Sequence, residues 1–323
     1  MAQGPEFYVF MENISSRQHF LKNGESPRPV LKDIDLLIRK SEVWGLIGPS
    51  LYEIKLLLEI IANIKPYDRG RCVLVERGMI RHKRIILNHV FYIGSSEMVY
   101  NNMKALEFLM FATAKMKMNK VELQEQLFEF MIKIGLGHLT LTLNHQLTKE
   151  EKAVIALLAA AYSDSRIIVF NLPEYEFDDI LINAISGIAA FTKEKEKTLI
   201  LGTPDSLLVE KACTHSAVIK NGSLIYTGTV KALRLKYDKI EVIIRDNHIA
   251  TMLNRLQELL PGYRVFLKEN SLMISSPSPK DDNRGFIYRK ILESGLTPEY
   301  LEINRKTVEN ALEELISPYD LYQ

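Results

Sequence analysis

The hydrophobic pattern in the first part of the chain predicts a strand, a short turn and a helix. Residues 42–49 are mostly apolar and end in a glycine turn, as a buried strand does. Two further strands are expected before this unit, at 7–11 and at 30–38, where apolar and polar positions alternate. Residues 51–64 place apolar side chains at helical spacing: Leu51, Ile54, Leu57, Leu58, Ile61 and Ile64. This order is the layout of a phosphate-binding loop in an α/β domain.

The middle of the chain, over about 100–162, is expected to be helical. Apolar residues recur at helical spacing in the segments 104–118, 120–134 and 148–162. The third segment begins with Thr148 and Glu151, which have the spacing of a capping box, in which each side chain accepts a hydrogen bond from the other residue's amide. We therefore expect a helical subdomain here.

Short apolar segments after this region predict strands of a parallel sheet. Residues 166–170 and 198–201 are almost continuously apolar, as in strands that are covered on both faces, and a helix over 179–191 is expected between them. Asn221 and Gly222 separate two more apolar runs and predict a tight β-hairpin. Alternating strands and helices indicate an α/β domain.

The last part of the chain predicts a small second domain with both helices and strands. The expected strands are 239–245, 263–267, 271–275 and 298–303, and the expected helices are 249–260, 284–294 and 307–316. The predicted domains are therefore 8–238 and 239–323. Residues 1–7 are set aside, because their sequence is typical of a cloning remnant.

Composition and charge exclude several classes of protein. The chain has 323 residues, of which 47% are hydrophobic, and its 41 basic and 40 acidic residues leave a net charge of +1. A dedicated nucleic-acid binder usually has a strong basic excess, so we expect no nucleic-acid partner. Two cysteines do not make a disulfide framework. We expect no signal peptide and no membrane span, because the apolar runs are much shorter than about 18 residues. The seven histidines show no metal-ligand spacing, so no metal is expected.

The order of these segments resembles the nucleotide-binding (ATP-binding) subunit of an ABC transporter. The resemblance covers about residues 7–237, and the last domain resembles the C-terminal accessory domain of exporter-type subunits. Its landmarks are the stretches 44–50, 147–148, 167–170 with Pro173 and Asp178, and 220–229. The resemblance implies an α/β, P-loop NTPase-like ABC ATPase domain, with a mixed sheet and a helical subdomain, followed by a small α+β domain.

The phosphate loop departs from the family pattern G-x-x-G-x-G-K-[S/T]. Glycines in this pattern let backbone amides approach the phosphates, the lysine neutralises their charge, and the Ser or Thr binds Mg²⁺. This chain has Gly48, Pro49, Ser50, Leu51, Tyr52, Glu53, Ile54 and Lys55. Only the first glycine is retained, because Leu51 and Glu53 replace the others. Ile54 takes the lysine position, and Lys55 takes the Ser/Thr position, one residue further along the helix, so its amine is expected to point elsewhere.

The other positions that the resemblance assigns to chemistry are also changed. The aspartate that holds Mg²⁺ and the glutamate that polarises water correspond to Asn171 and Leu172. The glutamine that contacts Mg²⁺ corresponds to Ser95, and the switch histidine corresponds to Pro204. The signature L-S-G-G-Q corresponds to Leu147, Thr148, Lys149, Glu150 and Glu151. In the family's dimer, each site combines one subunit's phosphate loop with the other's signature, so a pair with an intact subunit has no complete site.

The sequence therefore predicts a non-catalytic, pseudo-ATPase subunit with no catalytic residues and no bound ATP or Mg²⁺. The resemblance implies a membrane-spanning permease as partner, a location at the inner face of the cell membrane, and a homodimer or a pair with another ABC subunit. The expected permease surface contains Ser96, Tyr100, Asn101, Met103 and Phe108. Two alternatives stay open: a soluble adaptor that uses the fold for protein contacts, and an exporter subunit that binds ATP weakly.

Overall fold

A computed structural model gives the structure of the chain. It describes residues 7–19, 28–75, 77–78, 88–114, 119–237, 240–247, 249–268, 271–275, 284–293, 295–305 and 307–316. The chain forms two compact units, one up to Val230 and the other over residues 231–318. The predicted boundary, between residues 238 and 239, lies just after helix α8 (Val230–Tyr237).

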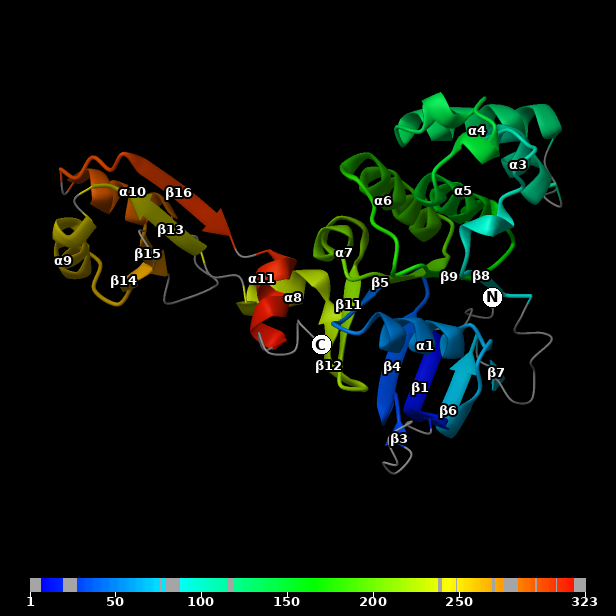
Figure 1. The fold of residues 1–323 in the computed structure, drawn as a ribbon, viewed down its shortest axis with the longest axis horizontal. Helices are drawn as coiled ribbons and strands as arrows, with labels where there is room; N and C mark the ends of the chain where they lie inside the picture. The colour runs from blue at the N-terminus through cyan, green and yellow to red at the C-terminus, as the bar shows by residue number, and fades with distance from the viewer. Residues whose placement is uncertain are drawn as a thin grey trace, which may run out of the picture. The chain divides into compact units, whose positions relative to one another are not determined.

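A six-stranded sheet forms the centre of the first unit (Figure 1). Its strand order is β12-β11-β5-β10-β9-β8, in which β12 is antiparallel to β11 and the other neighbours are parallel. The strands are β5 (Val43–Ile47), β8 (Val90–Ile93), β9 (Ile167–Asn171), β10 (Thr198–Gly202), β11 (His215–Lys220) and β12 (Ser223–Thr229). Every residue of β5, β9 and β10 is buried, which explains their continuously apolar sequences.

An antiparallel sheet and one helix complete the core of this unit. The sheet has the order β4-β1-β6-β7 and consists of β1 (Phe7–Ser16), β4 (Ile34–Arg39), β6 (Tyr67–Leu74) and β7 (Arg77–Gly78). A short pair, β2 (Gln18–His19) and β3 (Arg28–Pro29), forms a separate two-stranded sheet. Helix α1 (Leu51–Ile61) belongs to one hydrophobic cluster with residues of both larger sheets. Ile54, Leu57, Leu58 and Ile61 of the predicted apolar stripe are buried, whereas Leu51 is exposed and Ile64 lies beyond the end of the helix and is also exposed.

The predicted helical region forms a separate layer of the first unit (Figure 1). It contains α3 (Ala105–Ala112), α4 (Lys120–Lys133) and α5 (Lys149–Tyr162), with short turns η1 (Ser96–Met98), η2 (Gly137–Leu139) and η3 (Asn144–Gln146). Helix α3 is shorter than the predicted helix 104–118, whose last four residues lie outside the described ones. Two further helices, α6 (Asp179–Glu194) and α7 (Ser206–Ala212), follow β9 and β10.

Local signals in the sequence correspond to observed turns and caps. Asn221 and Gly222 join β11 to β12 with positive φ angles of 50° and 77°, as the hairpin prediction requires. Thr148 and Glu151 form the predicted capping box at the start of α5. The N-cap of α6 is Asp178, whose side chain accepts from the Leu181 amide at 2.8 Å.

The second unit has a four-stranded antiparallel sheet in the order β14-β15-β13-β16. Its elements follow α8 as β13 (Ile240–Arg245), α9 (Ile249–Leu259), β14 (Arg264–Lys268), β15 (Ser271–Ser275), α10 (Arg284–Glu293), β16 (Tyr300–Arg305) and α11 (Val308–Leu315). This is the predicted order of strands and helices, and its first six elements form a β-α-β-β-α-β motif. Buried residues of the strands, α9 and α10 form their own hydrophobic cluster.

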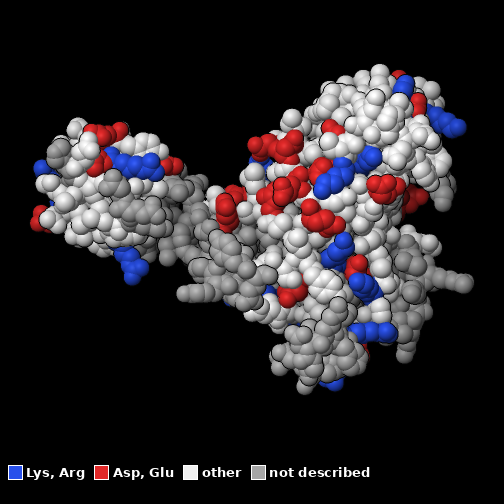
Figure 2. All heavy atoms as spheres, viewed as in Figure 1, with Lys and Arg blue, Asp and Glu red and all other residues white. Residues whose placement is uncertain are grey.

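Within the described residues, no helix is both long enough and apolar enough to cross a membrane. Acidic and basic side chains are interspersed on the face drawn in Figure 2, in agreement with the balanced composition.

Candidate functional site

The segment between β5 and α1 is the candidate phosphate loop. Helix α1 begins at Leu51, and the Ser50 side chain caps it by accepting from the Glu53 amide at 3.3 Å. The Leu51 and Tyr52 side chains are exposed. Gly48 is required by packing, because a Cβ at this position would lie 2.2 Å from the Ile219 carbonyl oxygen. The surviving glycine therefore has a structural role that does not depend on a phosphate.

Glu53 lies in the first turn of α1, at a position that the resemblance aligns with a glycine. Burial raises the pKa of its carboxyl group, and a hydrogen bond from the Gly222 amide acts in the opposite direction. Its Oε2 atom is buried and has no hydrogen-bond partner among the described residues. This side chain places a carboxylate beside the loop and links it to the β11–β12 hairpin, so an approaching anion would meet negative charge.

Ile54, at the lysine position, points into the hydrophobic core. It is fully buried and belongs to the cluster that α1 forms with both sheets. A Cβ added to Gly202 would lie 2.9 Å from the Ile54 Cγ2 atom, which shows how closely β10 approaches α1. A phosphate-binding amine at residue 54 would have to leave this core.

Lys55 is next along the helix and makes an ion pair with Glu174, with 3.2 Å between Nζ and Oε1. Both side chains are about two-fifths exposed, so the pair contributes at most about 1 kcal/mol. The pair agrees with the expectation that this amine points elsewhere.

Asn171 is at the end of β9 and brings this strand close to α1 and β8. The fully buried side chain donates to the Lys55 carbonyl oxygen at 3.1 Å and to the Tyr92 hydroxyl at 3.0 Å. Its Oδ1 atom is buried and unpaired within the described part of the chain. Leu172 follows and is also buried. The fold therefore places Asn171 and Leu172 at the end of β9, where the resemblance expects an aspartate and a glutamate. The side chains present are an amide and an apolar isobutyl group.

Ser95 and Pro204 lie on loops at the same edge of the parallel sheet, since they follow the carboxyl ends of β8 and β10. The Ser95 side chain caps η1 by accepting from the Glu97 amide at 3.1 Å. Pro204 is exposed. Its neighbour Asp205 caps α7. None of these three side chains offers the imidazole or the carboxamide of the family pattern.

The segment 147–151, which the resemblance aligns with the signature, caps the start of helix α5 with its own side chains. Thr148 Oγ1 accepts from the Glu151 amide at 3.1 Å, and Glu151 Oε2 accepts from the Thr148 amide at 2.8 Å. Lys149 pairs with Glu150 at 3.4 Å and lies 4.9 Å from the centre of the Tyr175 ring, while Leu147 is buried. A phosphate at this helix start would therefore compete with the chain's own carboxylates.

Two residues of the predicted permease surface are not on the surface. Ser96 is buried, and its hydroxyl lies 3.0 Å from the Tyr175 hydroxyl. Phe108 is buried on the inner face of α3. Met103 is partly buried, and its carbonyl oxygen accepts from the Asn144 amide. Only part of the segment predicted to contact the permease is therefore exposed to solvent.

Exposed aromatic groups remain at this surface. Tyr100 is 54% exposed and Phe111 is 55% exposed, and their ring centres are 5.6 Å apart. Phe111 is the last residue of the segment 95–111 in which the sequence predicts the permease surface, and it is exposed whereas Phe108 is buried. Asn101 is exposed and accepts from the Lys152 ammonium at 2.9 Å. The exposed part of the surface thus combines two aromatic rings with polar groups.

A cavity of about 380 Å³ lies between α3, α4 and η2 in the same subdomain. Leu141, which contributes to its lining, is 69% exposed. The lining residues are Lys104, Leu106, Glu107, Met110, Gln124, Thr140 and Leu141. The lining thus combines polar and charged side chains with three apolar ones.

Comparison with solved structures identifies the fold as the α/β P-loop fold of ABC ATPases, with the mixed sheet and the helical subdomain that were predicted. A structure of cbiO1 from Clostridium perfringens, described as part of the ABC transporter complex cbiONQ, is similar with a TM-score of 0.57 and 16% identity. The similarity covers 80% of this chain and 97% of that chain. The ATP binding subunit of an ABC transporter is similar with a TM-score of 0.55 and 16% identity, over 71% of this chain and 93% of that chain.

Sequence relatives support the same class. An uncharacterised ABC transporter ATP-binding protein of Synechocystis is 22% identical over 67% of this chain, which spans 61% of that protein's length. The glutamine transport ATP-binding protein GlnQ of Escherichia coli is 23% identical over 70% of this chain and 92% of that protein. No family model matches the chain. The relatives and structures support a resemblance to ABC ATP-binding subunits at low identity.

Proposed function

We propose that this chain is a subunit of an ABC transporter that binds a membrane permease and acts as scaffold or regulator of an export system, without turning over ATP. The relatives are named as ATP-binding proteins, and cbiO1 is described as part of a transporter complex, which supports the transport role. The expected location is the inner face of the cell membrane. Pairing with a second copy or with another ABC subunit is part of the proposal.

The proposal depends mainly on one observation: the chain's own side chains occupy the starts of α1 and α5, the two helix starts at which the resemblance expects phosphate binding. Glu53 and Ser50 occupy the start of α1, and Thr148 and Glu151 cap the start of α5. A helix start attracts an anion by only about 0.3–1 kcal/mol when it is exposed. An opposing unit charge at about 4 Å costs on the order of 1–4 kcal/mol. Repulsion and occupied amides therefore outweigh the attraction at both termini.

ATP turnover tests the catalytic half of the proposal. Losing one well-placed acid, base or electrostatic group typically costs about 10²–10⁴ in rate. We expect phosphate release from purified protein and Mg-ATP to stay at background, with an active ABC ATPase assayed in parallel. A turnover near 1 s⁻¹, which is ordinary for an enzyme, would contradict the proposal. A Lys55→Ala variant then reports whether this amine supports the activity.

Co-purification from detergent extracts tests the permease half. We expect a polytopic membrane protein to accompany the wild-type chain and to be lost with Phe111→Glu, because a charge would enter the exposed aromatic pair. Phe128→Glu is the matched control, since Phe128 is also exposed but lies on α4. Recovery of a soluble protein in place of a membrane protein would favour the adaptor alternative.

A further inference from the structure

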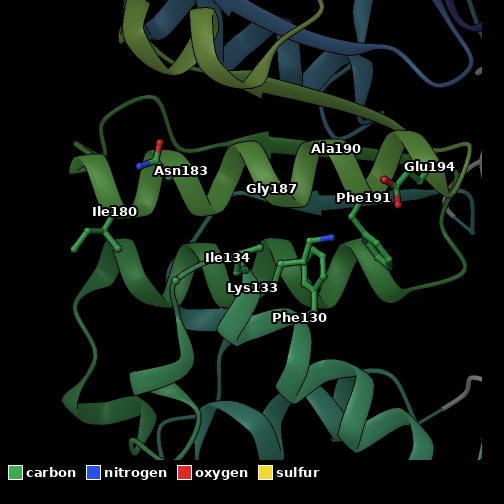
Figure 3. Close-up of a pocket in the computed structure, with 10 residues that line it drawn as sticks. Phe130, Lys133, Ile134, Ile180, Asn183, Gly187, Ala190, Phe191 and Glu194 are labelled. Carbon is green, nitrogen blue, oxygen red and sulfur yellow. The ribbon is translucent and has the colours of Figure 1, made fainter.

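Helix α6 joins the helical subdomain to the central sheet, because it packs against both α5 and β10. Its contact with α4 is apolar: a Cβ added to Gly187 would lie 2.7 Å from the Ile134 Cγ2 atom, and the ring centres of Phe130 and Phe191 are 4.8 Å apart. These residues line the α4–α6 groove, whose volume is about 750 Å³ (Figure 3). Apolar contact is not directional, so it holds the two layers together without fixing the loops between them.

The loop that follows β9 is fixed to that strand by its own contacts. The Tyr175 amide donates to the Leu172 carbonyl oxygen at 3.1 Å. The Phe177 ring centre lies 5.9 Å from that of Phe170, which is buried in β9. Tyr175 is therefore held at a defined distance from the central sheet.

The Tyr175 side chain connects this loop to two segments of the helical subdomain. Its hydroxyl lies 3.0 Å from the hydroxyl of the buried Ser96 in η1. The Lys149 ammonium, at the start of α5, lies 4.9 Å from the centre of the Tyr175 ring. One half-buried side chain thus contacts two segments that are more than fifty residues apart in the sequence.

The place of Tyr100, one of the two exposed rings of the permease surface, depends on η1. The Val99 amide donates to the Ser96 carbonyl oxygen at 3.2 Å, and the Val99 side chain is buried directly before Tyr100. On the other side, the Tyr100 carbonyl oxygen accepts from the Asn144 side chain at 2.9 Å. The contacts of η1 and of Asn144 therefore fix the backbone on both sides of Tyr100.

We propose that Tyr175 is a positioning residue for the permease surface. Its hydroxyl holds Ser96, and thereby Tyr100, at a fixed place relative to β9. The contact consists of the chain's own side chains, so it needs no nucleotide, as a scaffold subunit requires. Ser96 has the same role from the other side of the hydrogen bond and need not touch the partner. The inference rests on the proposed function, because it concerns the surface that binds the permease.

Amide hydrogen exchange of the chain alone tests the positioning. Tyr175→Phe removes the hydroxyl and retains the ring. We expect exchange at least about threefold faster in peptides that contain Val99 and Met103, whose amides donate within this segment, because the loss of a hydrogen bond favours local opening. Unchanged exchange in Tyr175→Phe would overturn this inference and would leave the proposed function standing.

Tyr226→Phe is the matched control variant. It also removes one tyrosine hydroxyl, which donates to the Thr229 carbonyl oxygen at 2.9 Å on β12. Exchange in the segment that contains Val99 should stay at the wild-type rate in this variant. Equal acceleration in the two variants would show a general loss of stability and would overturn the inference. Thermal unfolding checks that both variants are folded.

Co-purification from detergent extracts tests the effect on partner binding. Tyr175→Phe and Ser96→Ala should each lower the amount of accompanying membrane protein at least about threefold. The double variant should lower it no further, because both changes remove the same hydrogen bond. Two losses that add in the double variant, or undiminished capture by Tyr175→Phe, would overturn the inference. If no membrane protein accompanied the wild-type chain, the proposed function itself would fail, and this inference with it.

Discussion

Glu53 lowers the stability of the folded chain when it is ionised, because its carboxyl group is partly buried. Its pKa is raised by burial, so the folded chain binds a proton here more readily than the unfolded chain does. The free energy of unfolding therefore falls as pH rises from the ordinary value of 4.5 through the raised pKa, and the loss is complete above it. An ionised Glu53 thus lowers stability at neutral pH.

Glu53→Gln should stabilise the protein at pH 7, because the amide keeps an acceptor for the Gly222 amide without a buried charge. We expect the melting temperature to rise by about 1–3 °C at pH 7 and the difference to vanish near pH 4. Thermal unfolding at both pH values measures this. Glu122→Gln, at an exposed position of α4, is the control and should change little. A lower melting temperature for Glu53→Gln at pH 7 would contradict this account.

Lys197 caps the end of α5 with a partly buried amine. Its ammonium donates to the carbonyl oxygens of Ala161 and Ser163, near the end of the helix. Burial lowers the pKa of Lys197 to about 8, and Asp164 opposes this effect. The folded chain therefore loses this proton before the unfolded chain does, so stability should rise with pH between about 8 and 10.5.

Lys197→Met should raise the free energy of unfolding at pH 7, because it removes an ammonium that burial disfavours, as the lowered pKa of Lys197 indicates. The variant should also lack the rise in stability between pH 8 and 10.5. Urea unfolding at pH 7 and at pH 10 tests both statements. Lys193→Met, at an exposed position near the end of α6, should be close to neutral. Equal pH dependence of Lys197→Met and the wild type would show that another group titrates.

Among the elements, helix α5 depends on its N-terminal cap. Thr148→Ala removes the hydroxyl that accepts the Glu151 amide and should cost about 1 kcal/mol of stability. Thr148→Ser retains the hydroxyl and should restore most of this loss. Chemical denaturation of the two variants gives the comparison. No difference between Ala and Ser would mean that the cap does not contribute.

The turn between β5 and α1 depends on close packing against β11. Gly48→Ala should destabilise the chain by about 2 kcal/mol or more, because its Cβ would overlap the Ile219 backbone oxygen. Gly285→Ala, in α10, is the control, since no atom lies within 4 Å of its added Cβ. Thermal unfolding without nucleotide should separate the two variants. A neutral Gly48→Ala would indicate that the turn relaxes.

At the scale of the whole molecule, the prediction concerns nucleotide. A ligand stabilises the folded state in proportion to RT ln(1+[L]/Kd). Because Glu53 and the capped helix starts oppose an anion, millimolar Mg-ATP should leave the melting temperature unchanged. A rise of several degrees would overturn this prediction. If the rise were absent in Lys55→Ala, this amine would be the phosphate ligand.

The burial of the residues in the loop determines which variants can serve as controls when the melting temperature is measured with Mg-ATP. Restoring the family's lysine by Ile54→Lys is unsuitable, because Ile54 is fully buried among apolar side chains. An ammonium there would be desolvated, and the variant would unfold for reasons unrelated to nucleotide. The Lys55 side chain is partly exposed and can be removed without this cost.

The sequence alone determined the α/β class, the order of the elements in the second unit, the β11–β12 hairpin and the α5 capping box. Each of these follows from local physics: the periodicity of apolar residues, the positive φ angles at Asn221 and Gly222, and hydrogen bonds between residues three apart. The residues at positions 54, 55, 171 and 172, which the resemblance aligns with the family's functional groups, could also be named from the sequence, because they are identified by position along the chain.

Only the tertiary structure decided where those side chains point. Ser96 and Phe108 are buried and Phe111 is exposed, although all three lie in one predicted surface segment. Ile54 and Lys55 are neighbours, but one enters the core and the other pairs with Glu174, more than a hundred residues away. The α4–α6 groove likewise exists only when the two helices pack together. Burial and long-range pairing depend on segments distant in sequence, so local patterns cannot specify them.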